Sequence, residues 1–127
     1  LFVGDVLFRL GCGRVFEGTI EQMYDSLNKL LNLSDDIKVY CGHEYTLNNL
    51  KFLEHFLIEN NILENVKTQI LKDLEIDKRT IPFFLGDEKK SNPFLNPNCE
   101  LTSEFKMNNN FSNLQLFRYL REKKDNF

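Results

Sequence analysis

A short, largely apolar run at residues 37–41 (IKVYC) limits the possible folds of this chain more than any other segment. Its length and composition predict a buried strand. Gly42 ends the run and His43 follows at once, which puts an imidazole at the tip of a rigid element. Thr46 then offers an N-cap for a helix. A histidine in this place is a candidate metal ligand, although a histidine after a glycine, taken by itself, is more often an ordinary turn residue.

Another strand is predicted at residues 1–8, interrupted by Gly4 and Asp5. Between the two strands, residues 19–22 (TIEQ) form a capping box, and apolar side chains then recur with helical spacing through Leu31. Strand, helix and strand in this order indicate one unit of an α/β fold. The glycine-rich residues 11–18 predict a loop outside the core that allows close approach of the backbone to a ligand. They lack the residue order of a phosphate-binding P-loop.

The second part of the sequence predicts mainly helices. Leucines at positions 47, 50, 53 and 57 and apolar residues at 66, 70 and 74 have the spacing of two helices, linked at Asn60 and Asn61. Residues 77–111 contain three prolines and predict irregular structure. Residues 112–115 (SNLQ) form another capping box, which predicts a last helix through about Lys124. His55 lies off the leucine stripe, and we expect an exposed residue without a role.

Size and charge exclude several classes of protein. With 127 residues the chain can form one modest core, and 42% hydrophobic and 28% charged residues are ordinary for a globular protein. The net charge of -3 argues against a broad nucleic-acid surface, and no apolar run approaches the length of a membrane span. Three widely spaced cysteines exclude a CxxC zinc site and fit a reducing compartment, so we expect a cytoplasmic protein.

Five motifs together resemble glyoxalase II, the hydroxyacylglutathione hydrolase family of the metallo-β-lactamase superfamily. In the order of that family they are GD at residues 4–5, GCGRVFEGT at 11–19, YCGHEYT at 40–46, NPF at 92–94 and RxxKD at 121–125. The first motif has little value alone, but the second and third together are specific. The resemblance covers nearly the whole chain.

This resemblance implies an α/β fold with two parts. Residues 1–44 correspond to the C-terminal part of the family's four-layer αββα sandwich. Residues 45–127 correspond to the mostly helical domain that covers the active site and binds the substrate. Because the chain opens within a strand-like run and without an initiator methionine, we expect it to be the C-terminal fragment of a longer protein.

The resemblance also implies a binuclear metal site. Asp5 matches the carboxylate that bridges two divalent metal ions, and His43 matches a ligand of the second; zinc is expected first, with iron or manganese as alternatives. The local sequence around Asp5 alone would favour a turn acid after glycine. The family's THxHxDH cluster and a further histidine are missing, since this chain has only two histidines. We therefore expect these residues not to complete the site by themselves.

Basic residues at family positions imply capture of glutathione, whose two carboxylates pair with cations. Arg121 and Lys124 share a helix face, where they would hold the glycine carboxylate; a solvated basic helix end is the alternative. Arg14 and Tyr45 also match glutathione-contact positions, and arginine keeps the charge of the lysine that some relatives have. Phe16 matches as well, but it stands where some relatives have tyrosine, so a hydroxyl contact is lost.

The activity that the resemblance implies is hydrolysis of S-D-lactoylglutathione to D-lactate and glutathione by a metal-bound hydroxide. Cys12 and Cys41 lie within the motifs, but neither has a base nearby in the sequence, and we expect small buried residues rather than nucleophiles. One alternative is a non-catalytic interaction module, which the missing ligands favour. Another is a different superfamily enzyme; the negative charge argues against a nuclease and the RxxKD motif against a persulfide dioxygenase.

Overall fold

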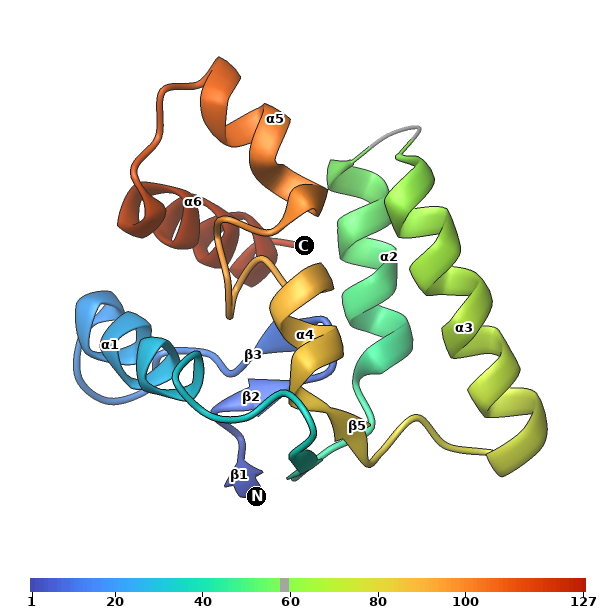
Figure 1. The fold of residues 1–127 in the computed structure, drawn as a ribbon. Helices are drawn as coiled ribbons and strands as arrows, with labels where there is room; N and C mark the ends of the chain where they lie inside the picture. The colour runs from blue at the N-terminus through green and yellow to red at the C-terminus, as the bar shows by residue number, and fades with distance from the viewer. Residues whose placement is uncertain (58–59) are drawn as a thin grey trace.

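The structure, a computed structural model, describes residues 1–57 and 60–127. The described chain is a mixed α/β fold that becomes mostly helical in its second part (Figure 1). In chain order its elements are β1 (Phe2–Gly4), β2 (Leu7–Phe8), β3 (Gly11–Cys12), α1 (Ile20–Leu30), β4 (Lys38–Cys41), α2 (Thr46–Phe56), α3 (Asn61–Asp77), β5 (Phe83–Phe84), α4 (Leu85–Ser91), α5 (Glu100–Asn108) and α6 (Asn113–Asp125).

β4 is the middle strand of a three-stranded sheet. β1 lies parallel to it, with Phe2 opposite Tyr40, and β5 lies antiparallel, with Phe83 opposite Val39. The predicted strand–helix–strand unit is confirmed, since α1 lies between the two parallel strands in the sequence. Parallel strands place their C-terminal ends at the same edge of a sheet, so the segments that follow Gly4 and Cys41 begin side by side.

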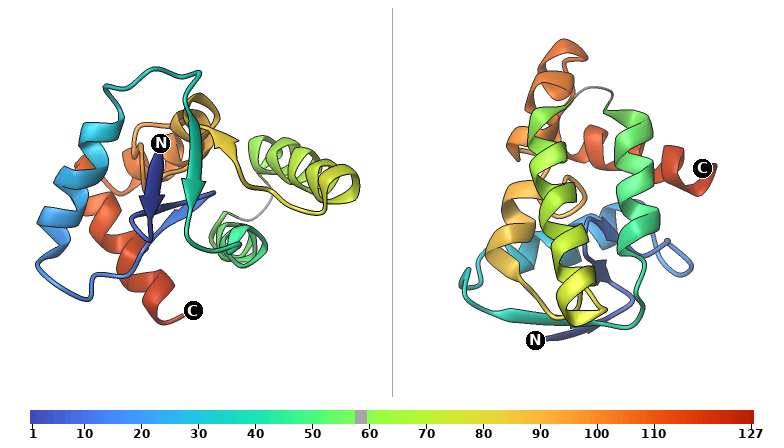
Figure 2. Two further views of the ribbon diagram at one scale, coloured as in Figure 1. Left: turned by 90° about the horizontal axis from the view of Figure 1, so that it is seen from below. Right: turned by 90° about the vertical axis from the view of Figure 1, so that its right-hand side faces the viewer.

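Both predicted capping boxes are present. The Thr19 and Ser112 side chains accept from the backbone N–H groups of Gln22 and Gln115, which open α1 and α6. These two helices, far apart in the sequence, lie against each other, as the left view of Figure 2 shows. The rings of Tyr24 and Phe117 meet there with centroids 5.6 Å apart. The first and last helices therefore close the structure on one side.

The prediction that residues 11–18 lie outside the core is wrong for the first three of them. Gly11, Cys12 and Gly13 are buried, and β2 and β3 form an antiparallel hairpin. Only a glycine fits at position 11, since a Cβ there would lie 2.7 Å from the Asn49 amide nitrogen. Gly11 serves close packing of the hairpin against α2, which local sequence does not reveal.

The prediction of irregular structure over residues 77–111 is also wrong. The segment contains β5, α4 and α5, and its prolines stand between these elements rather than inside them.

Thr46 does not cap α2: Tyr45 is its N-cap residue, and the Thr46 hydroxyl lies 2.6 Å from the Thr80 hydroxyl. Leu47 is 45% exposed and leaves the predicted stripe. Asn60 caps α3 and Asn61 is the first residue of that helix, so the predicted link lies at the start of α3.

One hydrophobic core serves both predicted parts of the chain. Residues 1–44 contribute four strands and one helix to the described structure, which do not by themselves build a four-layer sandwich. β5 completes their sheet from the second part. Within the described residues, the helices are too short or too polar to cross a membrane. The fully buried side chains at the centre of the core include Leu7, Leu27, Val39, Leu53, Ile70, Phe94, Phe117 and Leu120.

Candidate functional site

Asp5 and His43 meet where the parallel strands β1 and β4 end. The Asp5 Oδ1 atom lies 3.0 Å from the His43 Nδ1 atom, although 38 residues separate them in the sequence. The Gly42 N–H donates to the Gly4 carbonyl at 2.8 Å, which ties the two turns together. Both side chains remain open to solvent, 65% for the carboxylate and 50% for the imidazole. The structure thus brings together the two predicted metal ligands.

Two glycines make this approach possible. Gly4 has a φ of 54°, a left-handed conformation that glycine adopts without steric cost. A Cβ on Gly42 would lie 2.5 Å from the Asp5 Oδ1 atom. Any larger residue at position 42 would push the carboxylate away from His43, so both motif glycines are explained by the geometry of this pair.

The pair fits part of a metal site. A carboxylate oxygen and an imidazole nitrogen are donors that zinc, iron and manganese accept. A catalytic zinc normally has three protein ligands and an open position. Within residues 1–57 and 60–127, no group of three or more His, Cys, Asp or Glu side chains could hold a metal ion. Among the described residues, Asp5 and His43 therefore supply only two of the ligands that such a centre needs.

A cavity of about 410 Å³ opens beside this pair. Six of the seven predicted site residues line it, and His43, the seventh, stacks on Tyr45 with ring centroids 4.8 Å apart. We call this cavity the candidate pocket. Its lining comes from the start of the chain, the β2–β3 hairpin, α2 and α6, and consists of Asp5, Phe8, Cys12, Gly13, Arg14, Phe16, Tyr45, Asn48, Asn49, Arg121 and Lys124.

Arg121 is an anchor of the pocket wall. Its side chain is 3% exposed, which excludes the solvated helix end for this residue. Its Nη1 atom donates to the carbonyls of Cys12 at 2.8 Å and Gly13 at 3.2 Å, and its Nη2 atom lies 2.8 Å from Asp125. The guanidinium also lies over the Phe94 ring, 5.5 Å from its centroid. These contacts hold β3 and Gly13, which form one wall of the pocket, against α6.

Lys124 is the more available cation. It is half-buried, and its Nζ atom lies 5.8 Å from the centre of the Phe52 ring. Burial lowers the pKa of its amine, and the nearby positive charges of Arg121 and Arg14 lower it further, against the opposing effects of Cys12 and Asp125. An anion in the pocket would relieve this crowding of positive charge. The neighbourhood therefore favours a carboxylate ligand next to Lys124.

The remaining predicted residues lie at the rim. Arg14 is exposed, with its Nε atom 3.9 Å from Asp125. Phe16 is 86% exposed and offers only its ring. Tyr45 is held between two rings, with its centroid 4.9 Å from that of Phe8. The hydroxyl of Tyr45 is thus the phenolic group that the pocket lining offers to a ligand.

Sequence reasoning missed several groups that shape the pocket. Asn49 is 2% exposed and donates from its amide to the Arg9 carbonyl at 3.0 Å. The available signal in the sequence was the position of Asn49, a polar residue next to Leu50 of the leucine stripe in α2. Glu44, between the two motif residues His43 and Tyr45, instead accepts from the Thr80 hydroxyl at 2.7 and 2.8 Å. It fastens the motif to the chain before β5.

The environments of the two motif cysteines, Cys12 and Cys41, argue against a nucleophile role. Burial raises the pKa of the Cys12 thiol to about 11, although the charge of Arg121 opposes this. Cys41 is half-buried, and burial raises its pKa as well. At neutral pH both therefore remain protonated, and the thiolate is the reactive form. The interpretation as small buried residues is confirmed for Cys12.

Comparison with known proteins shows the family of this chain. A family model for the C-terminus of hydroxyacylglutathione hydrolase matches residues 44–127. Relatives named hydroxyacylglutathione hydrolase are 46% identical in Microcystis aeruginosa, 43% in Pectobacterium atrosepticum and 42% in Bartonella tribocorum. Each alignment covers 100% of this chain but 49%, 51% and 50% of the relative, so the chain spans about half their length. The chain belongs to the hydroxyacylglutathione hydrolase family.

Proposed function

We propose that the intact protein hydrolyses S-D-lactoylglutathione to D-lactate and glutathione. The name of the relatives supports a hydroxyacyl thioester of glutathione as the substrate class. The observation that carries the proposal is the convergence of Arg14, Tyr45 and Lys124 on one pocket beside Asp5 and His43. A peptide carboxylate and a reacting thioester would then lie at opposite ends of the same bound molecule.

The pocket residues would act mainly on binding and orientation. Lys124 would pair with a carboxylate of glutathione, with Arg14 at the rim, and Tyr45 would donate a hydrogen bond from its hydroxyl. Arg121 would contribute positive charge to the pocket, while its donors hold the wall. Held at these points, the substrate loses the freedom to rotate its thioester away from Asp5 and His43.

Asp5 and His43 would hold part of a pair of divalent metal ions, with zinc the first choice and iron or manganese as alternatives. When bound, such ions lower the pKa of a water and polarise a carbonyl. Tyr45 supports His43 by stacking on its ring, with an angle of 3° between the planes. The remaining ligands would come from outside these 127 residues, and this chain alone is expected to be inactive.

We also propose that residues 1–44 belong to a metallo-β-lactamase-like domain and residues 45–127 to the helical substrate-binding domain. The family match, which begins at residue 44, supports this boundary. The three cysteines are unpaired, which supports a reducing compartment such as the cytoplasm.

The test is hydrolysis of S-D-lactoylglutathione by the purified intact protein loaded with zinc, iron or manganese. The matched substrate is the D-lactoyl thioester of N-acetylcysteamine, which has the same reacting bond but no glutathione carboxylates. We expect rapid turnover of the first and a much higher KM for the second. Equal KM values would contradict glutathione recognition, and no turnover with any of the three metals would contradict the activity.

A further inference from the structure

The turn of the β2–β3 hairpin has an unusual backbone conformation. Phe8 pairs with Gly11, so Arg9 and Leu10 form a two-residue loop. Leu10 has a φ of 62°, in the left-handed region that residues with a branched side chain rarely adopt. Tight hairpin loops require such angles, and glycine or asparagine usually supplies them. A leucine in this place persists only where the surroundings fix the turn.

The side chains of Glu88 in α4 and of Asn92, the C-cap residue of that helix, fix this turn from far along the sequence. The Glu88 Oε2 atom accepts from the Leu10 N–H at 2.8 Å, across 78 residues. The Asn92 amide donates to the carbonyls of Phe8 at 3.2 Å and Gly11 at 3.1 Å, and to Glu88 Oε2 at 2.8 Å. Glu88 is 1% exposed and Asn92 is fully buried. The two residues, one helical turn apart, thus bond the backbone on both sides of the loop.

The hairpin connects this turn directly to the candidate pocket. Its first strand follows Asp5, and its second strand leads into Gly13 and Arg14. The Gly13 N–H donates to the Val6 carbonyl at 3.1 Å, and a Cβ on Gly13 would lie 1.9 Å from the Asp5 carbonyl oxygen. Asp5 and Gly13 are therefore packed backbone to backbone. Movement of the hairpin would displace both Asp5 and Arg14.

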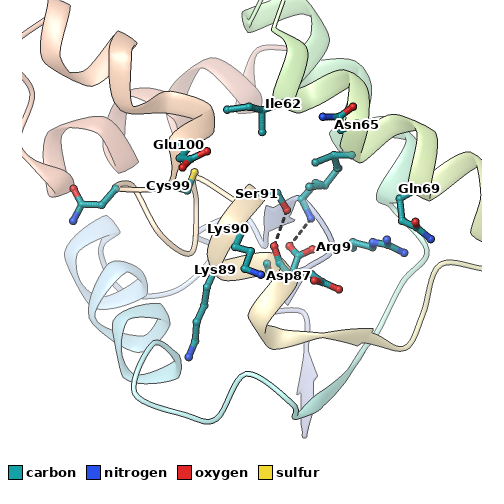
Figure 3. Close-up of a pocket in the computed structure, with 14 residues that line it drawn as sticks. Arg9, Ile62, Asn65, Gln69, Asp87, Lys89, Lys90, Ser91, Cys99 and Glu100 are labelled. Carbon is teal, nitrogen blue, oxygen red and sulfur yellow. Dashed lines mark hydrogen bonds between the residues drawn. The ribbon is translucent and has the colours of Figure 1, made fainter.

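Open volume borders the same turn on the side of α4. A separate cavity of about 730 Å³ lies between α3, α4 and α5, with Arg9, Asn65 and Ser91 among its lining residues (Figure 3). Leu10 and Glu88 also line it, and it shares no lining residue with the candidate pocket. The hydrogen bond from the Leu10 N–H to Glu88 restrains this side of the turn, and the Asn49 amide donates to the Arg9 carbonyl of the same peptide bond.

We propose that Glu88 and Asn92 are positioning residues for the candidate pocket, because they fix the β2–β3 turn and through it the places of Asp5 and Arg14. The proposal rests on the proposed function for its activity measurement only. A second measurement, on the turn itself, is independent of that function.

The test uses four variants of the intact protein. Glu88→Met keeps the chain length but removes the acceptor oxygens, whereas Glu88→Gln keeps one. Glu88→Asp keeps the carboxylate but withdraws it from the turn, and it replaces the methionine variant should that protein not fold. Leu63→Ala, a core deletion on α3, is the control for a loss of stability without a change at the turn.

All variants are compared at a temperature at which circular dichroism shows them folded. We expect Glu88→Met and Glu88→Asp to lower kcat/KM by about 10- to 100-fold, as losses of supporting contacts around a site do. Glu88→Gln and Leu63→Ala should keep most of it. Amide hydrogen exchange at Leu10 and Gly13, measured relative to the other strand amides, should accelerate in Glu88→Met and Glu88→Asp and in neither of the other two variants.

Wild-type kcat/KM in the folded Glu88→Met and Glu88→Asp proteins would overturn the proposal, whatever happens to exchange. So would unchanged exchange at Leu10. A wild-type protein without thioesterase activity would contradict the proposed function instead; the exchange measurement would then decide, since accelerated exchange at both Leu10 and Gly13 still supports positioning of the hairpin.

Discussion

Replacing Glu88 by glutamine should remove a loss of stability that the wild-type protein undergoes as the pH rises. Burial raises the pKa of the Glu88 carboxyl from 4.5 to about 7. The Leu10 N–H, the Asn92 amide and the charge of Arg9 oppose this rise, and the charge of Asp87 adds to it. Between these two pH values the folded protein holds a proton that the unfolded chain has released.

The sign of the effect follows from this difference in bound protons. Because unfolding releases the proton, raising the pH favours the unfolded state. The stabilisation is complete below pH 4.5 and is lost as the pH rises through about 7. A pKa difference from 4.5 to 7, at 1.36 kcal/mol per unit, corresponds to about 3 kcal/mol of unfolding free energy.

The assay is urea unfolding of wild type and Glu88→Gln at about pH 5 and about pH 8. Comparison of the two proteins cancels the contributions of all other titrating groups. We expect the stability of wild type relative to the variant to fall by about 2.5 kcal/mol between the two conditions, less than the full difference because unfolding already releases part of the proton at pH 5. A difference between the proteins that is the same at both pH values would refute the reasoning, because Glu88 would then titrate alike in both states.

Three further predictions concern α6 and the sheet. Lys124→Met in the intact protein should raise KM by about 10- to 100-fold and leave kcat nearly unchanged. The lost charge-assisted bond lies far from the thioester, so its loss affects the ground state and the transition state alike. A lowered kcat at constant KM would contradict this prediction. Arg121→Met should reduce the unfolding free energy by about 3–5 kcal/mol, because it removes the buried donor to the Cys12 and Gly13 carbonyls and the nearer of the two arginines beside Asp125. Urea unfolding measures this change, and a loss below about 1 kcal/mol would contradict the anchoring role. The 127-residue chain should self-associate through the edge strand β1, where Phe2 is 85% exposed. Phe2→Lys should reduce the associated fraction measured by sedimentation analysis. A strictly monomeric wild-type chain would be the contrary result.

Local patterns predicted the elements whose cause is local. The capping boxes at Thr19 and Ser112 contain both of their partners within four residues, so α1 and α6 begin where the sequence indicates. The strand before Gly42 and its parallel pairing with β1 follow from apolar runs and from the order of elements. The meeting of Asp5 and His43 then follows from the direction of two parallel strands.

The elements that were missed depend on contacts from distant residues. α4 and α5 are short, and helices of 7 and 9 residues are marginal without packing from elsewhere. β2 and β3 have only two residues each and are held by Glu88, Asn92 and Arg121. Long-range bonds also explain why Arg121 is buried, although its sequence context left a solvated helix end open as an alternative. Its neighbours at helical spacing give no sign of the carbonyls of β3.

The most direct test of the account is whether Lys124 binds the glycine carboxylate of glutathione. It combines two proteins, wild type and Lys124→Met, with two substrates, S-D-lactoylglutathione and its glycinamide analogue. We predict that either change alone raises KM by about 10- to 100-fold and that both together cost little more, since each removes the same interaction. Two losses that multiply, or an amide substrate that wild type binds as well as the carboxylate, would contradict the assignment of the pocket.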